Sequence, residues 1–373
     1  MRVGAAAIFQ NLTEQQSDRD IYVAELRLAD LIEPLGFDSL WSVEHHFTGY
    51  TMVPDVTQFL SYMAGRTEKV ALGTMVVVLP WHDPVRVAEE LSMLDILCGG
   101  RLIVGIGRGA GRVEFEGLRI PQGESRARFR ESARIVLDAL RDGRIEHEGD
   151  FFRIPARDLR PRPFQGFADR VYGAMVSPES AALLADLGLG LLIIPQKPWE
   201  EIARDLEAHA DACRERGVEP PRPVAAAWVY CHADEGAAED GARRWIGNYW
   251  RSAMAHYEIG GAHFKAIPGY EYYGKLADLM EAAGPDVLEQ ITEAFVATQV
   301  WGTPSQCLAK IREIEERVGH EHFVGVFSFG GMPHGDAERS MRLFAAEVLP
   351  ALQGRRAAMR ALGSSRRRRS REG

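Results

Sequence analysis

Residues 37–47 read FDSLWSVEHHF, and this stretch does most to decide the fold. A short apolar run at 40–43 ends abruptly in Glu44, His45 and His46. A buried strand that delivers ionisable groups to the mouth of a site has this pattern, because the carboxyl ends of the strands carry the chemistry in a βα barrel. A solvated loop with paired histidines has the same local sequence. The rest of the chain has to decide between the two.

Strand-like apolar runs alternate with amphipathic helical patterns along nearly the whole chain. Helical crossovers return the chain in the same direction, so the strands are expected to pair in parallel. Eight such units favour an α/β fold, a closed (β/α)8 TIM-type barrel, over an open sheet. The expected strands are 2–9, 39–43, 70–79, 101–106, 170–174, 189–194, 224–231 and 323–328. The expected helices include 20–35, 84–97, 127–140, 179–187, 199–216 and 305–318, with helix starts at Pro54, Pro84, Pro198 and Pro304.

The residues beyond a minimal barrel fall in two insertions. Residues 145–154 read as a hairpin after the fourth strand. Residues 234–300, between the seventh and eighth strands, are too long for one crossover and include the aromatic stretch GYEYY at 269–273, so they form a candidate lid. We expect one barrel domain over 1–354 and a basic, disordered tail over 355–373.

Charge and cysteine content exclude several classes of function. The net charge is −9, and it becomes −16 without the last 19 residues, which hold eight of the 44 basic residues and one of the 53 acidic ones. An acidic body argues against nucleic-acid binding, which requires clustered Lys and Arg. Four widely spaced cysteines without a CxxC motif fit a reducing compartment. With no signal-peptide pattern and no long apolar stretch, we expect a soluble cytoplasmic protein without a membrane partner.

Two further motifs could bind an anion. Residues 105–111, GIGRGAG, match a dinucleotide fingerprint, but three strands precede them and no clear amphipathic helix follows at 112–117. We therefore favour a glycine-rich loop that directs Arg108 at an anion, with Arg126 as a second cation or an ordinary surface residue. Ser177-Pro178 begins a helix, whose free N–H groups either bind a phosphate or are simply capped.

The sequence offers no recognisable metal site. Residues 44–46 lack the HExxH spacing, and neighbouring side chains on an extended segment point to opposite faces. Another group of histidine and glutamate residues, His-Glu-His at 320–322, is expected to be a polar turn before the last strand.

In this order, the features resemble the bacterial luciferase-like, flavin-dependent monooxygenase family over residues 2–352. The chain is more similar to the luciferase α-subunit type than to the deazaflavin-dependent branch. The motifs that carry the resemblance are 36–38 with 44–48, 72–74 with 77–80, 84–85 with 88–89, 94–95 with 99–101, 105–109, 124–126 and 301–304.

The resemblance implies a barrel that binds reduced FMN at the carboxyl ends of the strands. It implies that His45 is the catalytic base or proton donor, and that Glu44 and His46 orient it or contact substrate. It places a non-prolyl cis peptide, Met75–Val76, under the flavin ring. The implied cofactor-binding residues are Met75, Val76, Gly107, Arg108, Ser125, Arg126, Ser177 and Ser180, of which Arg108, Arg126, Ser177 and Ser180 match phosphate-binding positions.

Two departures from the family pattern concern the space beside the flavin. Gly107 replaces a cysteine and Gly111 replaces an aromatic residue, so we expect a roomier site, and light emission from a long-chain aldehyde is not predicted. Five strand residues could line the pocket, although we expect most of them to belong to the barrel core: Phe9, Trp41, Val43, Val76 and Trp228.

The function implied by the resemblance is a two-component, FMN-dependent monooxygenase acting on a small organic substrate. Reduced FMN would come from a separate NAD(P)H:flavin reductase and react with O2 to a C4a-peroxide, which survives only where water is excluded. A homodimer is expected as well. The alternatives are a deazaflavin (F420)-dependent oxidoreductase on the same barrel and a non-catalytic flavin-binding or partner subunit.

Overall fold

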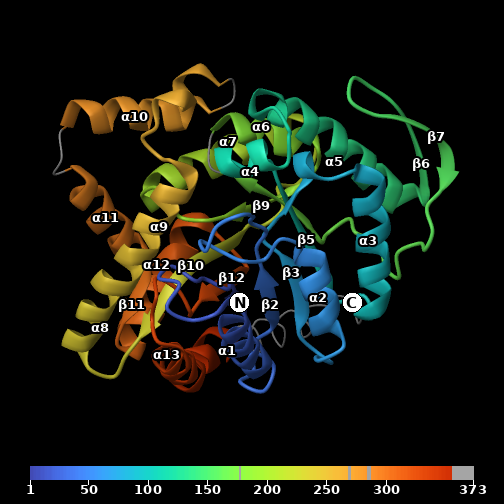
Figure 1. Cartoon of the computed structure of the whole chain (residues 1–373). Helices are drawn as coiled ribbons and strands as arrows, with labels where there is room; N and C mark the ends of the chain where they lie inside the picture. Colours follow the sequence, from blue (N-terminus) through green and yellow to red (C-terminus); the bar gives the residue numbers. More distant parts are fainter. Residues whose placement is uncertain (176–177, 268–269, 284–286, 355–373) are drawn as a thin grey trace, which may run out of the picture.

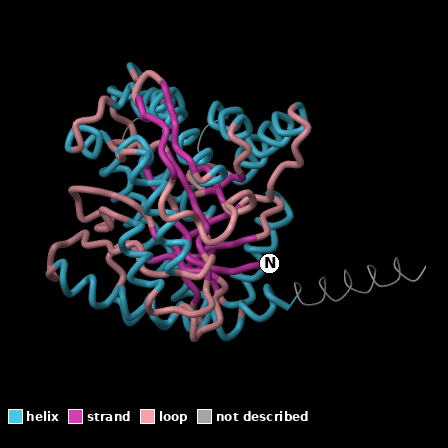
Figure 2. Tube along the Cα trace, turned by 90° about the vertical axis from the view of Figure 1, so that its right-hand side faces the viewer, coloured by secondary structure: helices cyan, strands magenta, loops and turns pink. Residues whose placement is uncertain are grey.

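The computed structural model describes residues 1–175, 178–267, 270–283 and 287–354. Its centre is a closed barrel of parallel strands surrounded by helices (Figures 1 and 2). The pairing order is β1-β2-β3-β5-β8-β9-β10-β12, and β12 pairs with β1 to close the barrel. The barrel strands are β1 (Arg2–Ala7), β2 (Ser39–Ser42), β3 (Ala71–Thr74), β5 (Leu102–Gly107), β8 (Val171–Met175), β9 (Gly190–Ile193), β10 (Val224–Cys231) and β12 (His322–Val326). The TIM-type α/β barrel expected from the sequence is confirmed.

Within the described ranges, one outer helix follows each barrel strand. These helices are α1 (Asp18–Leu31), α2 (Val56–Ala64), α3 (Pro84–Leu97), α5 (Ser125–Asp142), α6 (Pro178–Asp186), α7 (Trp199–Glu215), α12 (Pro304–Val318) and α13 (His334–Glu347). Pro84 and Pro304 are first residues of their helices, as expected, whereas α7 begins just after Pro198 and α2 two residues after Pro54. Helix α2 was expected only through its start at Pro54, and α13 has no counterpart among the expected helices.

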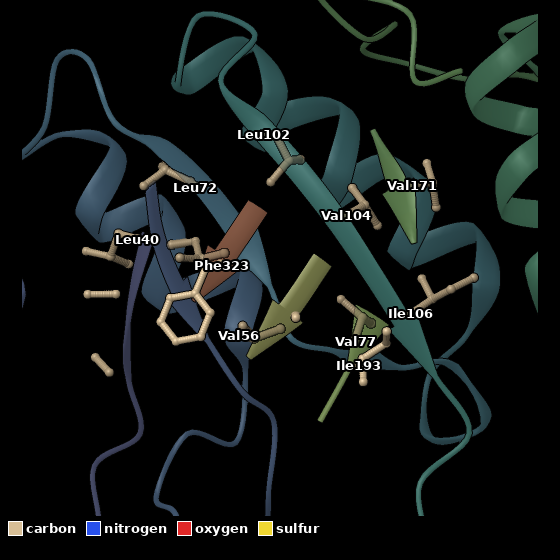
Figure 3. Close-up of a cluster of buried hydrophobic side chains, with 14 of the residues drawn as sticks. Leu40, Val56, Leu72, Val77, Leu102, Val104, Ile106, Val171, Ile193 and Phe323 are labelled. Carbon is tan, nitrogen blue, oxygen red and sulfur yellow. The ribbon is translucent and has the colours of Figure 1, made fainter. Parts of the chain in front are cut away.

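The strands bury both faces, because helices cover the outside and side chains fill the inside. Successive residues of a strand point to opposite sides, so Leu40 packs outward against the helices while Trp41 points into the barrel. The outer layer gathers apolar side chains from several strands, including Leu72, Leu102 and Val104 (Figure 3). The apolar runs in the sequence are long for this reason.

A polar network lies inside the barrel below the candidate site. The Trp41 indole N–H donates to Ser39 Oγ at 2.7 Å, and Ser39 Oγ lies 2.7 Å from Nε2 of His322. Gly73 is required beside it, since a Cβ there would stand 2.2 Å from the Trp41 ring. The polar turn expected at 320–322 is confirmed only in part: the chain bends at Glu321 before β12, but His320 is buried and His322 is already the buried first residue of β12.

The insertions lie where the sequence places them. The hairpin is formed by β6 (Arg144–Glu148) and β7 (Arg153–Asp158), which pair antiparallel at the opposite side of the barrel from α10 in Figure 1. The 234–300 insertion contains α8 (Glu235–Gly241), η3 (Ala242–Ile246), α9 (Gly247–Tyr257), η4 (Ala262–Ala266), α10 (Glu271–Ala283) and α11 (Val287–Thr298). The remaining short elements are β4 (Val77–Val78), η1 (Leu79–Trp81), α4 (Arg112–Gly117), η2 (Gln122–Glu124) and β11 (Val300–Gly302).

Helix α4 corrects one expectation, since no clear helix was expected at 112–117. Because its preceding strand β5 is the fourth strand of a closed barrel, the Rossmann alternative for 105–111 is excluded. The expected tail, 355–373, lies outside the described residues. In the part of the chain that the structure describes, no helix combines the length and apolar composition needed to cross a membrane.

Candidate active site

A cavity opens at the carboxyl end of the barrel. It encloses about 1260 Å³, including the part of its mouth open to solvent. Every barrel strand contributes a residue near its carboxyl end: Ile8, Val43, Met75, Gly107, Ala174, Ile194, Trp228 and Val326. The insertion contributes Tyr249, Tyr257 and Tyr273 to the same cavity.

The ring of His45 is held at both nitrogens. Its Nδ1 lies 2.9 Å from Glu114 Oε1, and the Tyr257 hydroxyl lies 3.1 Å from its Nε2. The His46 backbone N–H donates to the same Glu114 oxygen at 3.0 Å. Glu114 is fully buried, and burial alone would raise its pKa. The facing His45 ring with its hydrogen bond, and the approach of His256 Nε2 to 3.4 Å, outweigh burial and lower the pKa of Glu114 to about 2.

An ionised carboxylate can only accept hydrogen bonds. Nδ1 of His45 must therefore carry the proton that it shares with Glu114, and in the neutral ring Nε2 is the acceptor for the Tyr257 hydroxyl. His45 lines the cavity, so this arrangement gives the cavity an imidazole with a fixed tautomer. Such a ring can take a proton at Nε2 and return it.

The Glu44 carboxylate makes its hydrogen bonds with residues other than His45. Its oxygens lie 2.6 Å from His82 Nε2 and 3.3 Å from His46 Nε2, and accept the Val78 backbone N–H at 2.9 Å. Burial would raise the pKa of Glu44, but these bonds lower it. The resemblance implied that Glu44 and His46 orient His45 or contact substrate. The residues that hold the His45 ring are instead Glu114 and Tyr257, although Glu44 does line the cavity.

The loop between β3 and β4 forms one wall of the cavity. The Met75–Val76 peptide bond is cis, as the resemblance implied, and both residues line the cavity. Gly107 on β5 lies against this loop, since a Cβ at Gly107 would stand 2.4 Å from the Val76 side chain. The roomier site expected at Gly107 is therefore wrong, because Val76 occupies the space that a side chain would fill.

The space beside Gly111 is filled in the same way. A Cβ at Gly111 would stand 2.5 Å from Glu114 Oε2 and 3.3 Å from His256 Nε2. The absent aromatic side chain thus leaves room for the carboxylate that holds His45, and the roomier site expected here is wrong as well.

The phosphate-binding candidates are divided between the cavity and its surroundings. Arg108 and Ser180 line the cavity. The guanidinium of Arg108 lies 4.1 Å from the centre of the Tyr270 ring. Ser125 is buried outside the cavity lining, with its Oγ 3.1 Å from the Tyr270 hydroxyl, which also donates to the Gly109 carbonyl at 2.9 Å.

The two remaining phosphate candidates are Arg126 and Ser177. Arg126 lies in the first turn of α5 and is not among the described residues that line the cavity. Ser177 lies outside the described residues.

Three of the five strand residues considered for the pocket line it, namely Val43, Val76 and Trp228. Phe9 and Trp41 are core residues with fully buried side chains. Trp228 is buried in the core as well as lining the cavity, so three of the five belong to the core and the expectation for most of them is confirmed.

Functional candidates that sequence reasoning missed come from α4 and α9. Glu114 and His256 join His45 in one cluster, with His256 Nε2 3.4 Å from Glu114 Oε1 and His256 Nδ1 2.9 Å from Thr48 Oγ1. Burial lowers the pKa of His256, more than Glu114 raises it, so its ring is neutral. No local motif links residues so far apart in the chain. The one feature of the sequence that could have pointed to Glu114 was the glycine at position 111, three residues earlier, where the family pattern has an aromatic residue.

The cluster also has the composition of a metal site. Ligand-type atoms of His45, Glu114 and His256 lie within 4.8 Å of one another. Each imidazole has a partner at its other nitrogen, Tyr257 for His45 and Thr48 for His256. Glu114 Oε1 accepts hydrogen bonds from His45 and from the His46 backbone, whereas Glu114 Oε2 and His256 Nε2 have no hydrogen-bond partner among the described residues.

Acid is expected to weaken the wild-type protein more than the Glu114→Gln variant. Because the pKa of Glu114 is lower in the folded protein than its ordinary value of 4.5, the ionised carboxylate stabilises the fold at pH values above 4.5. This stabilisation is lost as the pH falls toward 2. Between pH 5 and 3, wild type should lose about 2 kcal/mol of unfolding free energy that the variant does not lose. Urea unfolding followed by circular dichroism measures both.

The matched control is Glu116→Gln, which removes an exposed carboxylate from the same helix and should behave as wild type. Equal losses of unfolding free energy in wild type and Glu114→Gln would show that the contacts of Glu114 do not lower its pKa in the folded protein.

Comparison with known proteins agrees with this geometry. The model of the luciferase-like monooxygenase family matches residues 1–321. The chain belongs to this family. Among solved structures, the monooxygenase RslO1 from Streptomyces bottropensis is 28% identical, with a TM-score of 0.74 over 94% of this chain and 99% of that one.

Curated relatives carry related names. The oxygenase component of a flavin-dependent trigonelline monooxygenase from Acinetobacter baylyi is 27% identical over 60% of this chain and 62% of its own length. An alkanal monooxygenase alpha chain from Aliivibrio fischeri is 26% identical over 86% of this chain and 90% of its own length. The chain spans 62% or less of the length of the first curated relatives it matches.

Two more distant structures share the fold. The oxygenating constituent of 3,6-diketocamphane monooxygenase from Pseudomonas putida, in complex with FMN, is 19% identical with a TM-score of 0.71, and covers 94% of this chain and 98% of that one. A coenzyme F420-dependent tetrahydromethanopterin reductase from Methanopyrus kandleri is 18% identical with a TM-score of 0.64, and covers 94% of this chain and 100% of that one.

Proposed function

We propose that this protein is the oxygenase component of a two-component, FMN-dependent monooxygenase. One atom of O2 enters a small organic substrate and the other leaves as water, while reduced FMN is oxidised to FMN. The observation that carries the proposal is that His45 and Arg108 line one cavity together with the Met75–Val76 peptide. Two of the curated or solved relatives are named for a flavin-dependent oxygenase component or contain FMN.

The described residues fit FMN. Gly107 and Gly109 line the cavity with backbone alone, and Gly109 has a positive φ of 78°, which favours glycine. Arg108 and Ser180 would hold the phosphate, and Met75–Val76 would support the ring. When bound, reduced FMN supplies two electrons and activates O2. His45 would move a proton at Nε2, with Glu114 and Tyr257 fixing its orientation.

The insertion is proposed to act as the lid. Its Tyr270 covers the Arg108 guanidinium and hydrogen-bonds to Ser125 and to the Gly109 carbonyl. A segment that contacts the phosphate end in this way would exclude water once the ligands are bound. A separate NAD(P)H:flavin reductase would supply the reduced FMN, and we expect a homodimer.

Rapid mixing of the protein and reduced FMN with O2 tests the proposal. Oxygen should disappear before the absorbance of oxidised FMN returns, because a site that excludes water would delay the step that restores the oxidised ring after O2 has been consumed. Free reduced FMN in buffer is the control without a delay. Tighter binding of reduced F420 than of reduced FMN would favour the F420-dependent alternative, whose fold neighbour is the tetrahydromethanopterin reductase, and would overturn the proposal.

A further inference from the structure

Three side chains of the kinds that bind metals meet beside the cavity from distant parts of the chain. His45 follows β2, Glu114 lies in α4 and His256 lies in α9 of the insertion, and α4 packs against α9. Two histidines and one carboxylate form a set of ligands that suits Zn²⁺ and related divalent transition metals. No sequence motif marks this set, because only tertiary packing brings the three residues together.

The separations between the ligand atoms suit one small ion. Glu114 Oε1 lies 2.9 Å from His45 Nδ1 and 3.4 Å from His256 Nε2. Two atoms that each lie about 2.1 Å from one Zn²⁺ are roughly 3.0 Å apart at a right angle and roughly 3.4 Å apart at a tetrahedral angle. Both separations therefore match those between ligands of a shared ion, and a small movement of the imidazoles would complete the coordination.

Two atoms of the cluster make no hydrogen bond with any described residue. They are Glu114 Oε2 and His256 Nε2, and both are buried. The exposed fraction of the side chain is 0% for Glu114 and 1% for His256. Buried polar atoms are nearly always paired, and an unpaired one destabilises the fold. A cation held by the two side chains would satisfy both atoms, whereas the hydrogen bonds of the cluster do not.

The same two atoms lie beside Gly111. A Cβ at this position would stand 2.5 Å from Glu114 Oε2 and 3.3 Å from His256 Nε2. The backbone does not require glycine, because its φ of −69° is one that any residue adopts. The glycine is therefore explained by the cluster, since a larger residue would displace the carboxylate that faces the imidazole.

Each imidazole is oriented through its other nitrogen. The Thr48 hydroxyl lies 2.9 Å from His256 Nδ1, and the Tyr257 hydroxyl lies 3.1 Å from His45 Nε2. Metal-binding histidines use the second ring nitrogen in this way, and the contact fixes the orientation of the ring. His45 lines both the active-site cavity and a neighbouring surface pocket. An ion can therefore approach the cluster from the side of His45, although Glu114 is buried.

We infer that His45 Nδ1, His256 Nε2 and the Glu114 carboxylate bind a divalent metal ion of the Zn²⁺ class. The ion would take the place of the proton that His45 Nδ1 shares with Glu114. Mg²⁺ and Ca²⁺ prefer oxygen ligands and are not expected to bind. The site itself does not rest on the proposed function, because none of these contacts involves a flavin.

A bound ion would also change what His45 can do. With Nδ1 on the ion, the ring proton is at Nε2, which donates to the Tyr257 hydroxyl and cannot take a second proton. This consequence does rest on the proposed function, under which Zn²⁺ should inhibit turnover and a chelator should restore it. Zn²⁺ binding without inhibition would reject the proton transfer assigned to His45 and leave the metal site standing.

Calorimetric titration of Zn²⁺ into the untagged, chelator-treated protein tests the site without flavin, substrate or O2. We expect one ion per chain with a dissociation constant of about 1 μM or less, and no binding of Mg²⁺ at the same concentrations. His256→Ala should weaken Zn²⁺ binding by about 100-fold or more, since it removes a ligand. The matched control is His263→Ala, which removes a histidine beside Glu258, outside the cluster, and should bind Zn²⁺ as wild type does. Absence of Zn²⁺ binding, or equal binding in His256→Ala, would overturn the inference.

A second pair of variants keeps all three ligands. Thr48→Val removes the hydroxyl that orients His256 and should raise the Zn²⁺ dissociation constant about 10-fold or more, whereas Thr48→Ser keeps the hydroxyl and should bind as wild type does. Co²⁺ reports on the same site, because its visible absorption is stronger in a four-coordinate protein site than in water. The Co²⁺ absorption should appear in wild type and Thr48→Ser and weaken in Thr48→Val at equal metal concentration. Equal Zn²⁺ affinities in the two Thr48 variants would refute His256 as a ligand.

Discussion

Replacing His45 with alanine is expected to lower turnover on the order of 10²–10⁴-fold while FMN binds nearly as before. The ring of His45 is the imidazole whose tautomer the protein fixes at the cavity, through Glu114 at Nδ1 and Tyr257 at Nε2. Alanine removes the group that moves the proton and leaves the residues proposed for the phosphate, Arg108 and Ser180, in place. Turnover is measured under saturating reduced FMN as O2-dependent conversion of a substrate found by screening small organic compounds, and FMN affinity is measured by fluorescence titration.

The His232→Ala variant is the matched control. His232 follows β10, its ring Nδ1 accepts the Asp234 backbone N–H, and it is absent from the described cavity lining. It should keep wild-type turnover. Full activity in His45→Ala would remove this imidazole from the mechanism, and a parallel loss of FMN binding would mean that the substitution had damaged the site as a whole.

The barrel could be predicted because its evidence is local. Each strand is a short apolar run bounded by polar residues, and the start of α3 is marked by a proline in the first turn next to the Asp83 cap. These signals depend on neighbours within a few residues. The position of His45 at a strand end could be predicted in the same way, because the apolar run stops one residue before Glu44.

The support of His45 could not be predicted, because it depends on contacts between distant segments. Glu114 is 69 residues from His45 in the chain, and Thr48 and His256, which complete the cluster, are 208 apart. The sequence around Glu114 shows only a charged residue shortly after a glycine-rich loop, and nothing in it indicates a helix or burial. Tertiary packing alone converts this carboxylate into the partner of two imidazoles.

The same reasoning explains the errors at the glycines and at His322. Replacing a side chain by glycine suggests empty space, but the volume of a site depends on what other strands send into it. Here Val76 and Glu114 fill the positions beside Gly107 and Gly111. A polar run suggests exposure, but His322 is buried because Ser39, 283 residues away, supplies a hydrogen-bond partner inside the barrel.

Replacing Arg108 with alanine is expected to weaken FMN binding by about 10- to 150-fold, which corresponds to roughly 1.5–3 kcal/mol for lost hydrogen bonds to a charged group. The guanidinium lines the cavity and its position is set by the Tyr270 ring, 4.1 Å away. A lysine at this position keeps the charge and loses the planar fork, so Arg108→Lys should fall between wild type and alanine.

Comparing FMN with riboflavin separates phosphate recognition from a general loss of structure, because riboflavin has the same ring without the phosphate. Fluorescence titrations of Arg108→Ala should show weaker FMN binding and unchanged riboflavin binding. Arg112→Ala is the control, since Arg112 pairs with Glu258 on the surface and is absent from the described cavity lining. Equal losses for both flavins would assign Arg108 a structural role. Unchanged FMN binding would place the phosphate elsewhere, and the shared cavity of Arg108 and His45 would no longer support the proposed orientation of the cofactor.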